Sequence, residues 1–231
     1  MMNFDRPKFI TFEGGEGSGK STQSKMLYEY LLSKGIKTIH TREVGGTVEA
    51  EKIRDLLIYS ELMLMSELLL VMAARYEHIN KVIIPALLEG SWVICDRFVD
   101  STACYQSGES GLTLEDIYKL HKKLMTANCD NEAENTAYPK VGIRKFVSQG
   151  IMPDLTFFMD IPPELGLKRV AARGDANKFE SKNISFHRKI YKRFKSIESM
   201  YPDRFLPIEC IDKTIKEIHE DILDKIFHTN I

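Results

Sequence analysis

The chain has 231 residues, which suits a single α/β unit, and its 43% hydrophobic and 28% charged residues are ordinary for a globular protein. Its 32 basic and 33 acidic side chains nearly cancel, which argues against a nucleic-acid-binding protein. No apolar run approaches the roughly 20 residues of a membrane span, and the first residues lack the apolar core of a signal peptide. We therefore expect a cytoplasmic protein without a nucleic-acid or membrane partner.

The cysteines are scattered along the chain at Cys95, Cys104, Cys129 and Cys210, and no pair has CxxC spacing. This distribution argues against a zinc site and against a disulfide framework. We expect them to be reduced structural thiols.

The first part of the chain alternates strand and helix patterns. Lys8–Glu13 is a short apolar strand pattern, a glycine-rich turn follows it, and the helix pattern of Lys20–Lys34 stops at Gly35. A second strand is expected at Thr38–Thr41 and a helix at Val48–Tyr59. Strand and helix patterns thus alternate over this part of the chain.

The alternation continues in the rest of the chain. Ser66–Leu88 has a helical pattern, in which Pro85 predicts a kink. Trp92–Cys95 is apolar, short and followed by Asp96, which suits a central strand that ends at a site. The remaining expected elements are a strand at Leu155–Asp160, a helix that ends at Arg173, a strand at Leu206–Ile211 and a closing helix.

This alternation predicts an α/β fold, in which a parallel sheet is covered by helices on both faces and binds ligands at the carboxyl ends of its strands. One stretch, Thr126–Val141, is polar and without hydrophobic period. Structureless segments of this length are uncommon inside compact domains. We interpret it as either an insertion or a functional loop.

Residues 14–21 (GGEGSGKS) match the phosphate-loop pattern GxxxxGK followed by Ser or Thr, between a strand pattern and a helix pattern. Glycines let backbone N–H groups converge on phosphate oxygens, and the helix N-terminus adds partial positive charge. Lys20 is expected to reach the β- and γ-phosphates as a catalytic cation, and Ser21 to help hold Mg²⁺. The predicted ATP-binding residues are Gly14, Gly15, Glu16, Gly17, Ser18, Gly19, Lys20, Ser21 and Thr22.

The phosphate loop indicates a nucleotide-binding protein but does not identify its reaction. Asp96 lies where an acid supports magnesium in this class of proteins, although it could also be an ordinary strand-end cap. Residues 177–180 (NKFE) resemble the NKxD motif that reads guanine, but glutamate stands where aspartate is needed and an arginine-rich helix pattern precedes it. A GTPase is therefore disfavoured.

Several stretches, in the order in which they occur, resemble the thymidylate kinases. They are FEGGEGSGKST, TREVGGT, EKIRDLL, AARYEH, DRF at Asp96–Phe98, STACYQSG at Ser101–Gly108, MPDLTFFMDIPPELGLKRVAARG and KFE. The resemblance implies a P-loop NTPase-type sheet in one domain (1–231), with a lid at about 174–184 and an atypical insertion at 126–141. It also implies transfer of phosphate from ATP to dTMP for dTTP synthesis, with Mg²⁺, by a homodimer.

The resemblance further assigns residues to the acceptor. Arg42 resembles a ligand of the acceptor phosphate, and Arg54 and Arg75 resemble further acceptor-side groups, of which Arg75 also reaches the base. Arg97 resembles the catalytic arginine between the donor and acceptor phosphates. The full dTMP-binding set implied by the resemblance is Glu16 near the sugar hydroxyl, Arg42, Arg54, Val71, Arg75, Arg97, Thr102 and Gln106 at the base edge, and Tyr105 against the deoxyribose.

The sequence departs from the family pattern at three positions. Val44 replaces the usual proline of the REPGGT stretch, which loosens that loop. Lys178 stands where relatives with an acidic phosphate loop usually carry a lid arginine, so we expect it to be a catalytic cation. Val71 stands where the family usually has a phenylalanine that stacks on thymine, which affects the expected base preference.

Two other functions stay open. Another pyrimidine monophosphate kinase would share these features, and a regulatory ATP-binding switch would share the phosphate loop without needing Arg42, Arg97 and Tyr105. The stretch Leu62–Ala74 is apolar almost all round, so it is expected either in the core or at a subunit interface. The resemblance favours the interface of a homodimer.

Overall fold

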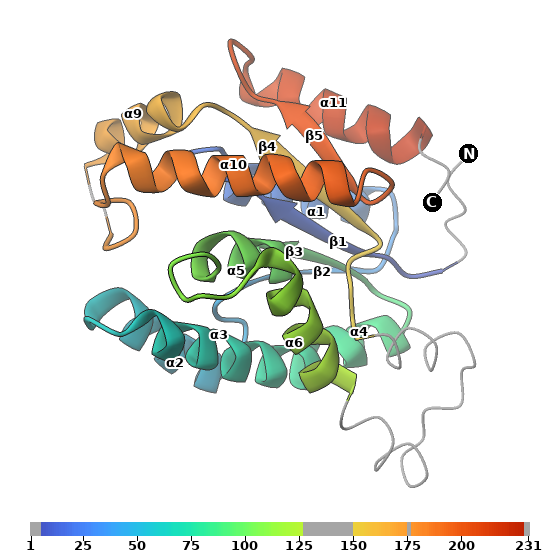
Figure 1. Ribbon diagram of the computed structural model, residues 1–231. Helices are drawn as coiled ribbons and strands as arrows, with labels where there is room; N and C mark the ends of the chain where they lie inside the picture. The colour runs from blue at the N-terminus through green and yellow to red at the C-terminus, as the bar shows by residue number, and fades with distance from the viewer. Residues whose placement is uncertain (1–5, 127–149, 175–176, 229–231) are drawn as a thin grey trace, which may run out of the picture.

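Parallel strands form one sheet at the centre of the structure, in the order β2-β3-β1-β4-β5 (Figure 1). The structure is a computed structural model, and it describes residues 6–126, 150–174 and 177–228. The strands are β1 (Phe9–Glu13), β2 (Thr38–Arg42), β3 (Trp92–Asp96), β4 (Leu155–Asp160) and β5 (Phe205–Glu209). The predicted α/β fold with a parallel sheet is therefore confirmed.

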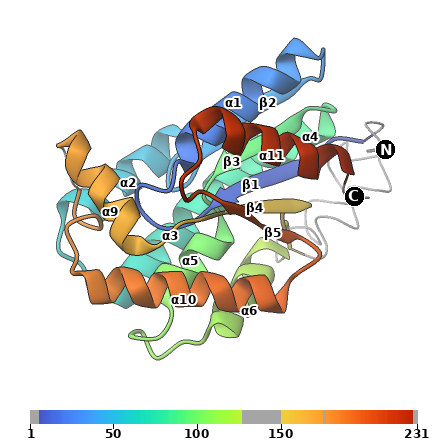
Figure 2. The ribbon, with the colours of Figure 1, turned by 90° about the horizontal axis from the view of Figure 1, so that it is seen from above.

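Helices cover both faces of this sheet. They are α1 (Lys20–Ser33), α2 (Val48–Tyr59), α3 (Leu64–His78), α4 (Ile84–Leu88), α5 (Val99–Gln106), α6 (Leu114–Thr126), α9 (Pro163–Arg173), α10 (Ile184–Met200) and α11 (Ile215–His228). Seen from above, α1 and α11 lie on one side of the strands and α6 and α10 on the other (Figure 2). Because both faces are covered, the central strands β1 and β4 are apolar and buried along nearly their whole length.

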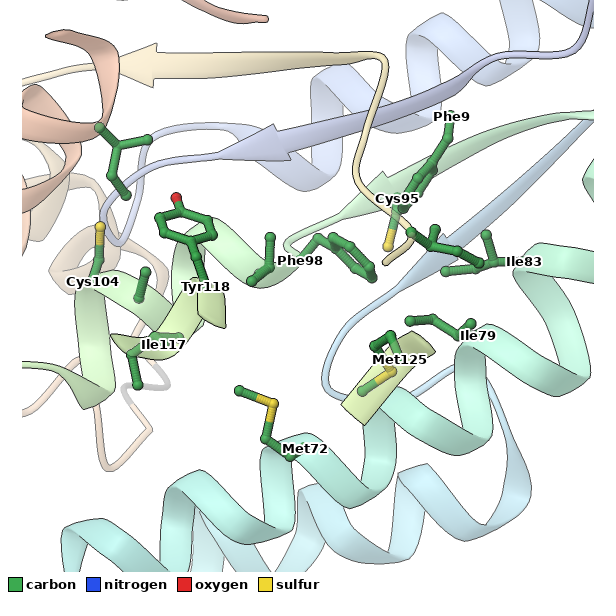
Figure 3. Close-up of a cluster of buried hydrophobic side chains, with 14 of the residues drawn as sticks. Phe9, Met72, Ile79, Ile83, Cys95, Phe98, Cys104, Ile117, Tyr118 and Met125 are labelled. Atoms are coloured by element: carbon green, nitrogen blue, oxygen red, sulfur yellow. The ribbon is translucent and has the colours of Figure 1, made fainter. Parts of the chain in front are cut away.

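Two apolar cores form because neighbouring strand residues point to opposite faces. On one face, Phe9 and Phe98 meet edge to face at 4.9 Å between ring centroids, and Met72, Ile79 and Met125 pack around them (Figure 3). On the other face, a second cluster of buried residues joins the sheet to α1 and α11. The strand ends therefore emerge between two packed cores.

The expected single helix Ser66–Leu88 is three segments in the structure. α3 passes into a π-helical segment, η1 (Ile79–Ile83), and then into α4. Pro85 lies in the first turn of α4, not at the irregularity itself. Proline cannot donate to a carbonyl one turn back, and its ring crowds that carbonyl. The wider turn therefore precedes Pro85, where the sequence analysis placed a simple kink.

Other expectations differ in extent. The predicted helix Val48–Tyr59 matches α2, whose N-terminus is capped by Thr47 because its hydroxyl accepts from Ala50 N at 3.1 Å. The elements expected from the sequence leave out α5, α6 and α10. Most of the expected insertion, 127–141, and Cys129 lie outside the described residues.

The stretch Leu62–Ala74 is not buried on every side. Leu68, Val71 and Met72 face the core, whereas Met63 is 80% exposed and Leu69 is 60% exposed. The helix thus has one core face and one exposed apolar face. In the part of the chain that the structure describes, no helix combines the length and the hydropathy needed to cross a membrane.

Candidate active site

The phosphate loop joins β1 to α1 and is shaped by its backbone. Gly17 has a φ of 66°, and a Cβ added there would lie 2.1 Å from the carbonyl oxygen of Gly166 in α9. A Cβ on Gly166 would in turn lie 2.2 Å from the carbonyl oxygen of Glu16. The loop and α9 can therefore approach this closely only with glycine on both sides. Gly166 had no place in the sequence-based site.

Lys20, the first residue of α1, folds back over the loop. Its Nζ donates to the carbonyl oxygen of Gly15 at 2.6 Å and to the Ser18 hydroxyl at 3.2 Å. Burial and the nearby charge of Arg97 lower the pKa of Lys20 to about 8, although Glu16 and Asp96 oppose this change. Additional negative charge beside Lys20, such as that of a bound phosphate, would therefore raise its pKa and favour the ammonium form.

Ser21 and Asp96 lie together, since the Ser21 hydroxyl donates to Asp96 Oδ2 across the ends of α1 and β3. The other oxygen, Asp96 Oδ1, is buried and finds no hydrogen-bond partner among the described residues. Mg²⁺ prefers oxygen ligands and commonly takes only one or two from the protein, with water and phosphate supplying the others. The unpartnered carboxylate oxygen and the hydroxyl fit that ligand pattern.

A large cleft lies over the phosphate loop and is called the phosphate-loop cleft here. The predicted residues that line it are Glu16, Gly17, Ser18, Gly19, Lys20, Ser21, Thr22, Arg42, Arg54, Asp96 and Arg97. Arg169 and Arg173 of α9 also line it. The repeat of arginines four residues apart on one helix face was the available sequence signal for these two cations.

Arg97 follows β3 in the left-handed region, with a φ of 69°, which is uncommon for a residue other than glycine. Its backbone N–H donates to the carbonyl oxygen of Phe12 at 3.0 Å. Its guanidinium donates to both Glu16 carboxylate oxygens at 2.9 Å and to the Ser101 hydroxyl at 3.1 Å. Such strained backbone is typical of residues whose side chain must point into a site.

Glu16 is the partner that fixes this arginine. Tyr105 donates its hydroxyl to Glu16 Oε1 at 2.7 Å, so one carboxylate binds both the arginine and the tyrosine. Burial disfavours the charge of Glu16, but Arg97 and Lys20 outweigh it and lower its pKa to about 2. The carboxylate is therefore ionised throughout the physiological range.

A second, smaller hollow lies beside the phosphate loop and is called the Arg75 cavity here. Glu16 and Arg97 line both hollows, so they stand at the junction. The predicted acceptor residues that line the Arg75 cavity are Glu16, Arg54, Val71, Arg75, Arg97, Thr102, Tyr105 and Gln106. The structure thus brings together the whole predicted acceptor set except Arg42.

Arg75 is held by a buried network. Its Nε donates to Glu43 at 2.7 Å, its Nη2 donates to the Thr102 hydroxyl at 2.7 Å, and its side chain is 1% exposed. His78 lies 3.0 Å from the other Glu43 oxygen. Burial disfavours the charge of Glu43, but Arg75 and His78 together keep its pKa below the ordinary value. Glu43 therefore orients Arg75, and sequence reasoning missed it.

Phe179 is a further lining residue of the Arg75 cavity that the sequence analysis did not assign to the acceptor. Its ring stands edge to face with Tyr105 at 6.1 Å between centroids. Val71 lines the same cavity from α3. The aromatic rings that line the cavity thus come from Phe98, Tyr105 and Phe179, and not from the helix position where the family pattern has one.

Arg42 and Lys178 lie apart from their expected partners. Arg42 is half exposed and pairs with Glu51 at 2.7 Å. It lines the phosphate-loop cleft but is not among the residues that line the Arg75 cavity. Lys178 donates to the carbonyl oxygen of Ser60 at 2.9 Å and to Glu67 at 2.8 Å. It is not among the described residues that line either hollow. In this structure, the expected phosphate cation Lys178 instead forms an ion pair with Glu67 on α3.

The NKFE stretch forms a local turn. The Asn177 side chain accepts from the backbone N–H of Phe179 at 2.9 Å and of Glu180 at 3.1 Å, while Glu180 accepts from Asn177 N at 2.8 Å. This reciprocal capping explains the asparagine and the glutamate without a base to read.

Comparisons with known proteins address the same assignment. The family model described as thymidylate kinase matches residues 12–130 and 140–222. A thymidylate kinase of Rickettsia africae (strain ESF-5) is 48% identical over 220 residues, which cover 95% of this chain and 97% of that protein. One from Rickettsia bellii (strain RML369-C) is 46% identical with 95% and 96% coverage.

The fold agrees with a solved structure as well. The crystal structure of thymidylate kinase from Ehrlichia chaffeensis matches with a TM-score of 0.68 and 30% identity, over 96% of this chain and 99% of that one. The family match, over residues 12–130 and 140–222, includes the phosphate loop, both hollows and Arg97. On these grounds, the chain belongs to the thymidylate kinase family.

Proposed function

We propose that this enzyme transfers the γ-phosphoryl group of ATP to the phosphate of dTMP, forming dTDP for dTTP synthesis. The observation that carries the proposal is the position of Arg97, which lines both the phosphate-loop cleft and the Arg75 cavity. A switch protein has no use for a second cavity joined to the first by an arginine. A kinase needs a cation at that junction, because two polyanions must approach each other there.

The phosphate-loop cleft is the proposed donor site. Backbone N–H groups of the loop and the N-terminus of α1 bind the phosphates, and the buried ammonium of Lys20 neutralises their charge. Arg169 and Arg173 of α9 also line the cleft and supply further positive charge. Because these groups are already in place, little reorganisation is needed during transfer.

Ser21 and Asp96 are the proposed holders of Mg²⁺. Asp96 Oδ1 is the buried oxygen that stays unpartnered among the described residues, and the Ser21 hydroxyl is beside Oδ2. When bound with ATP, the ion supplies charge neutralisation at the phosphates. The residues themselves provide its seat at the end of β3, next to Arg97.

The Arg75 cavity is the proposed acceptor site. Arg75 and Thr102 are hydrogen-bonded to each other and, with Gln106, present the polar groups for the base edge. Tyr105 provides the wall for the deoxyribose, and Arg54 and Arg97 bind the acceptor phosphate. Arginine suits this role since its planar fork binds phosphate oxygens in pairs and keeps its charge.

Chemistry in this arrangement is mainly positioning. The acceptor phosphate is already an ionised nucleophile, so no strong general base is required. Arg97 is preorganised by Glu16 and Ser101 and can give its donors to phosphate oxygens as the reactants arrive. Its bond to Glu16 keeps the cation in place before substrate binds.

We also propose that the enzyme is a homodimer and works in the cytoplasm. Val48, Tyr59, Met63 and Leu69 expose apolar side chains along α2 and α3, which is the kind of surface that a second copy covers. Leu69→Glu should convert the dimer to a monomer in light scattering after size exclusion, and an unchanged mass would contradict the interface.

The cysteines support the proposed cytoplasmic location. The buried free thiols of Cys95, Cys104 and Cys210 suit a reducing compartment.

The experiment that tests the reaction is ADP release coupled to an indicator, with and without dTMP. We expect strong dependence on dTMP, and a panel of dTMP, dUMP, UMP and dCMP should place dTMP first in kcat/KM. Preference for UMP or dCMP would favour the alternative, another pyrimidine monophosphate kinase. ADP release whose rate does not depend on any of the acceptors would favour a nucleotide-binding switch.

A further inference from the structure

The anchoring of residues 177–180 onto helices α2 and α3 has no role in the reaction proposed above. Lys178 Nζ donates both to the carbonyl oxygen of Ser60, the C-terminal cap of α2, and to Glu67 in the first turn of α3. The side chains of Lys178 and Glu67 are only 11% and 7% exposed. The cation thus lies in a seat formed by two helix ends and a carboxylate.

This seat suits an ammonium group for two reasons. The carbonyl groups at a helix C-terminus carry partial negative charge and lack partners within the helix, so Lys178 satisfies one of them at α2. Glu67 is nearly buried and needs a cation to offset its lost hydration. Removing either partner would leave the other charge buried, so the pair fixes where residue 178 lies.

The neighbouring residue is fixed in turn. The Phe179 backbone N–H is held by Asn177, its carbonyl oxygen accepts from Lys182 N at 3.2 Å, and Lys178 Nζ lies 5.7 Å from its ring centroid. The ring then lines the Arg75 cavity in edge-to-face contact with Tyr105. Leu57 and Ile58 of α2 and Val71 of α3 also line this cavity. Lys178 is hydrogen-bonded to the ends of the same two helices.

From this geometry we propose that Phe179 supplies the aromatic wall for the acceptor base, and that the Lys178–Glu67 ion pair positions it. The proposal rests on the proposed function, since it concerns the acceptor of that reaction. Val71 presents a small branched chain where an aromatic ring would stack from α3, and Phe179 brings a ring to the same cavity from another segment. Lys178 is then a positioning residue for the acceptor and not a cation for the transferring phosphate.

Direct binding of dTMP, measured by calorimetry without ATP, tests the ring. Phe179→Ala should weaken dTMP binding by about tenfold, the scale of a lost base–aromatic contact, while Phe179→Tyr should keep most of it. The KM for ATP and kcat at saturating dTMP should change little. Lys182→Ala, an exposed lysine on the same segment, is the matched control and should behave as the unmodified enzyme.

A kinetic split tests the ion pair. Lys178→Ala and Glu67→Gln should each raise the KM for dTMP, and combining Lys178→Ala with Phe179→Ala should add little to Phe179→Ala alone. Because Lys178→Ala leaves a buried carboxylate, Lys178→Met with Glu67→Gln provides a variant without an unpaired charge. A fall in kcat with an unchanged KM for dTMP in the Lys178 variants would overturn the proposal and restore a phosphate-binding role.

Moving the ring gives the sharpest test. Val71→Phe combined with Phe179→Ala should recover dTMP affinity relative to Phe179→Ala, since the aromatic face returns from α3. Failure of Phe179→Ala to weaken binding would refute the proposal. An unmodified enzyme that binds and phosphorylates a different monophosphate would refute the proposed function alone, and a Phe179→Ala effect on that acceptor would still support the aromatic wall.

Discussion

In the phosphate-loop cleft the loop itself is shaped by backbone, with Gly17 pressed against Gly166 and Lys20 folded over the Gly15 carbonyl. In the Arg75 cavity the walls are side chains from the phosphate loop, α2, α3, α5 and residues 177–180. A site built from backbone needs a fixed spacing of glycines, whereas a site built from side chains needs only that distant segments converge. The first kind can be recognised from a short motif, and the second depends on the complete fold.

The two regions meet at Arg97, so its loss should give the largest effect on turnover. Arg97→Ala should lower kcat by about 10³-fold or more, on the scale of arginine fingers in other phosphoryl transferases. Lys20→Ala should be similarly severe while leaving the fold intact. The measurement is dTMP-dependent ADP release, and the control is Arg188→Ala, because Arg188 is exposed and its guanidinium pairs with Glu164. Near-normal turnover of Arg97→Ala would show that the two hollows do not cooperate.

The side-chain region should discriminate acceptors only moderately. One methyl group separates dTMP from dUMP, and a hydrophobic pocket exploits such a difference by about 10–200-fold. We expect dUMP to be a detectable but poor acceptor in kcat/KM. If the ratio of kcat/KM for dTMP to that for dUMP were far above this range, apolar contact with the methyl group could not by itself explain how the Arg75 cavity discriminates between them.

The backbone region should tolerate no added atom. Gly166→Ala places a Cβ against the Glu16 carbonyl, so either α9 or the phosphate loop must move. Overpacking of this kind costs about 1–3 kcal/mol. We expect weaker ATP binding and a lower Tm, with dTMP binding less affected. Equal loss of both affinities would contradict the separation between the two regions.

Titration of Lys20 gives the smallest expected effect. In the empty protein its pKa is about 8, and bound phosphates raise it because negative charge favours the ammonium. The bound state then holds the proton more tightly, so ATP affinity should be constant below this pKa and fall as pH rises through it, by up to about tenfold per pH unit. A non-hydrolysable ATP analogue titrated between pH 6 and pH 9.5 measures this. A flat profile would mean that Lys20 does not contact the phosphates.

The sequence predicted the sheet and the phosphate loop well, because short buried strands and fixed glycine spacing act locally. Lys178 is predicted as a phosphate cation, and its pairing with Glu67 could not be anticipated, because Glu67 is more than a hundred residues away and no local pattern shows the pair. Phe179 was missed for the same reason. Its ring reaches the Arg75 cavity only when 177–180 folds against α2 and α3. Glu43 could have been suspected as the charge partner that a buried Arg75 requires.

The π-helical segment η1 also sets the rotational phase of the helix pair that it joins. A helix turns by about 100° for each residue, so one residue more or fewer between α3 and α4 rotates one helix relative to the other by that angle. With η1 in place, α3 presents Arg75 and His78 to the acceptor side while α4 presents Ala86 and Leu87 to the core. Deleting one residue within 79–83 would therefore rotate α4 relative to α3. Either the site side chains of α3 or the core side chains of α4 would then turn away from their present partners. The site side chains of α3 and the core side chains of α4 are in register only because this turn is one residue longer.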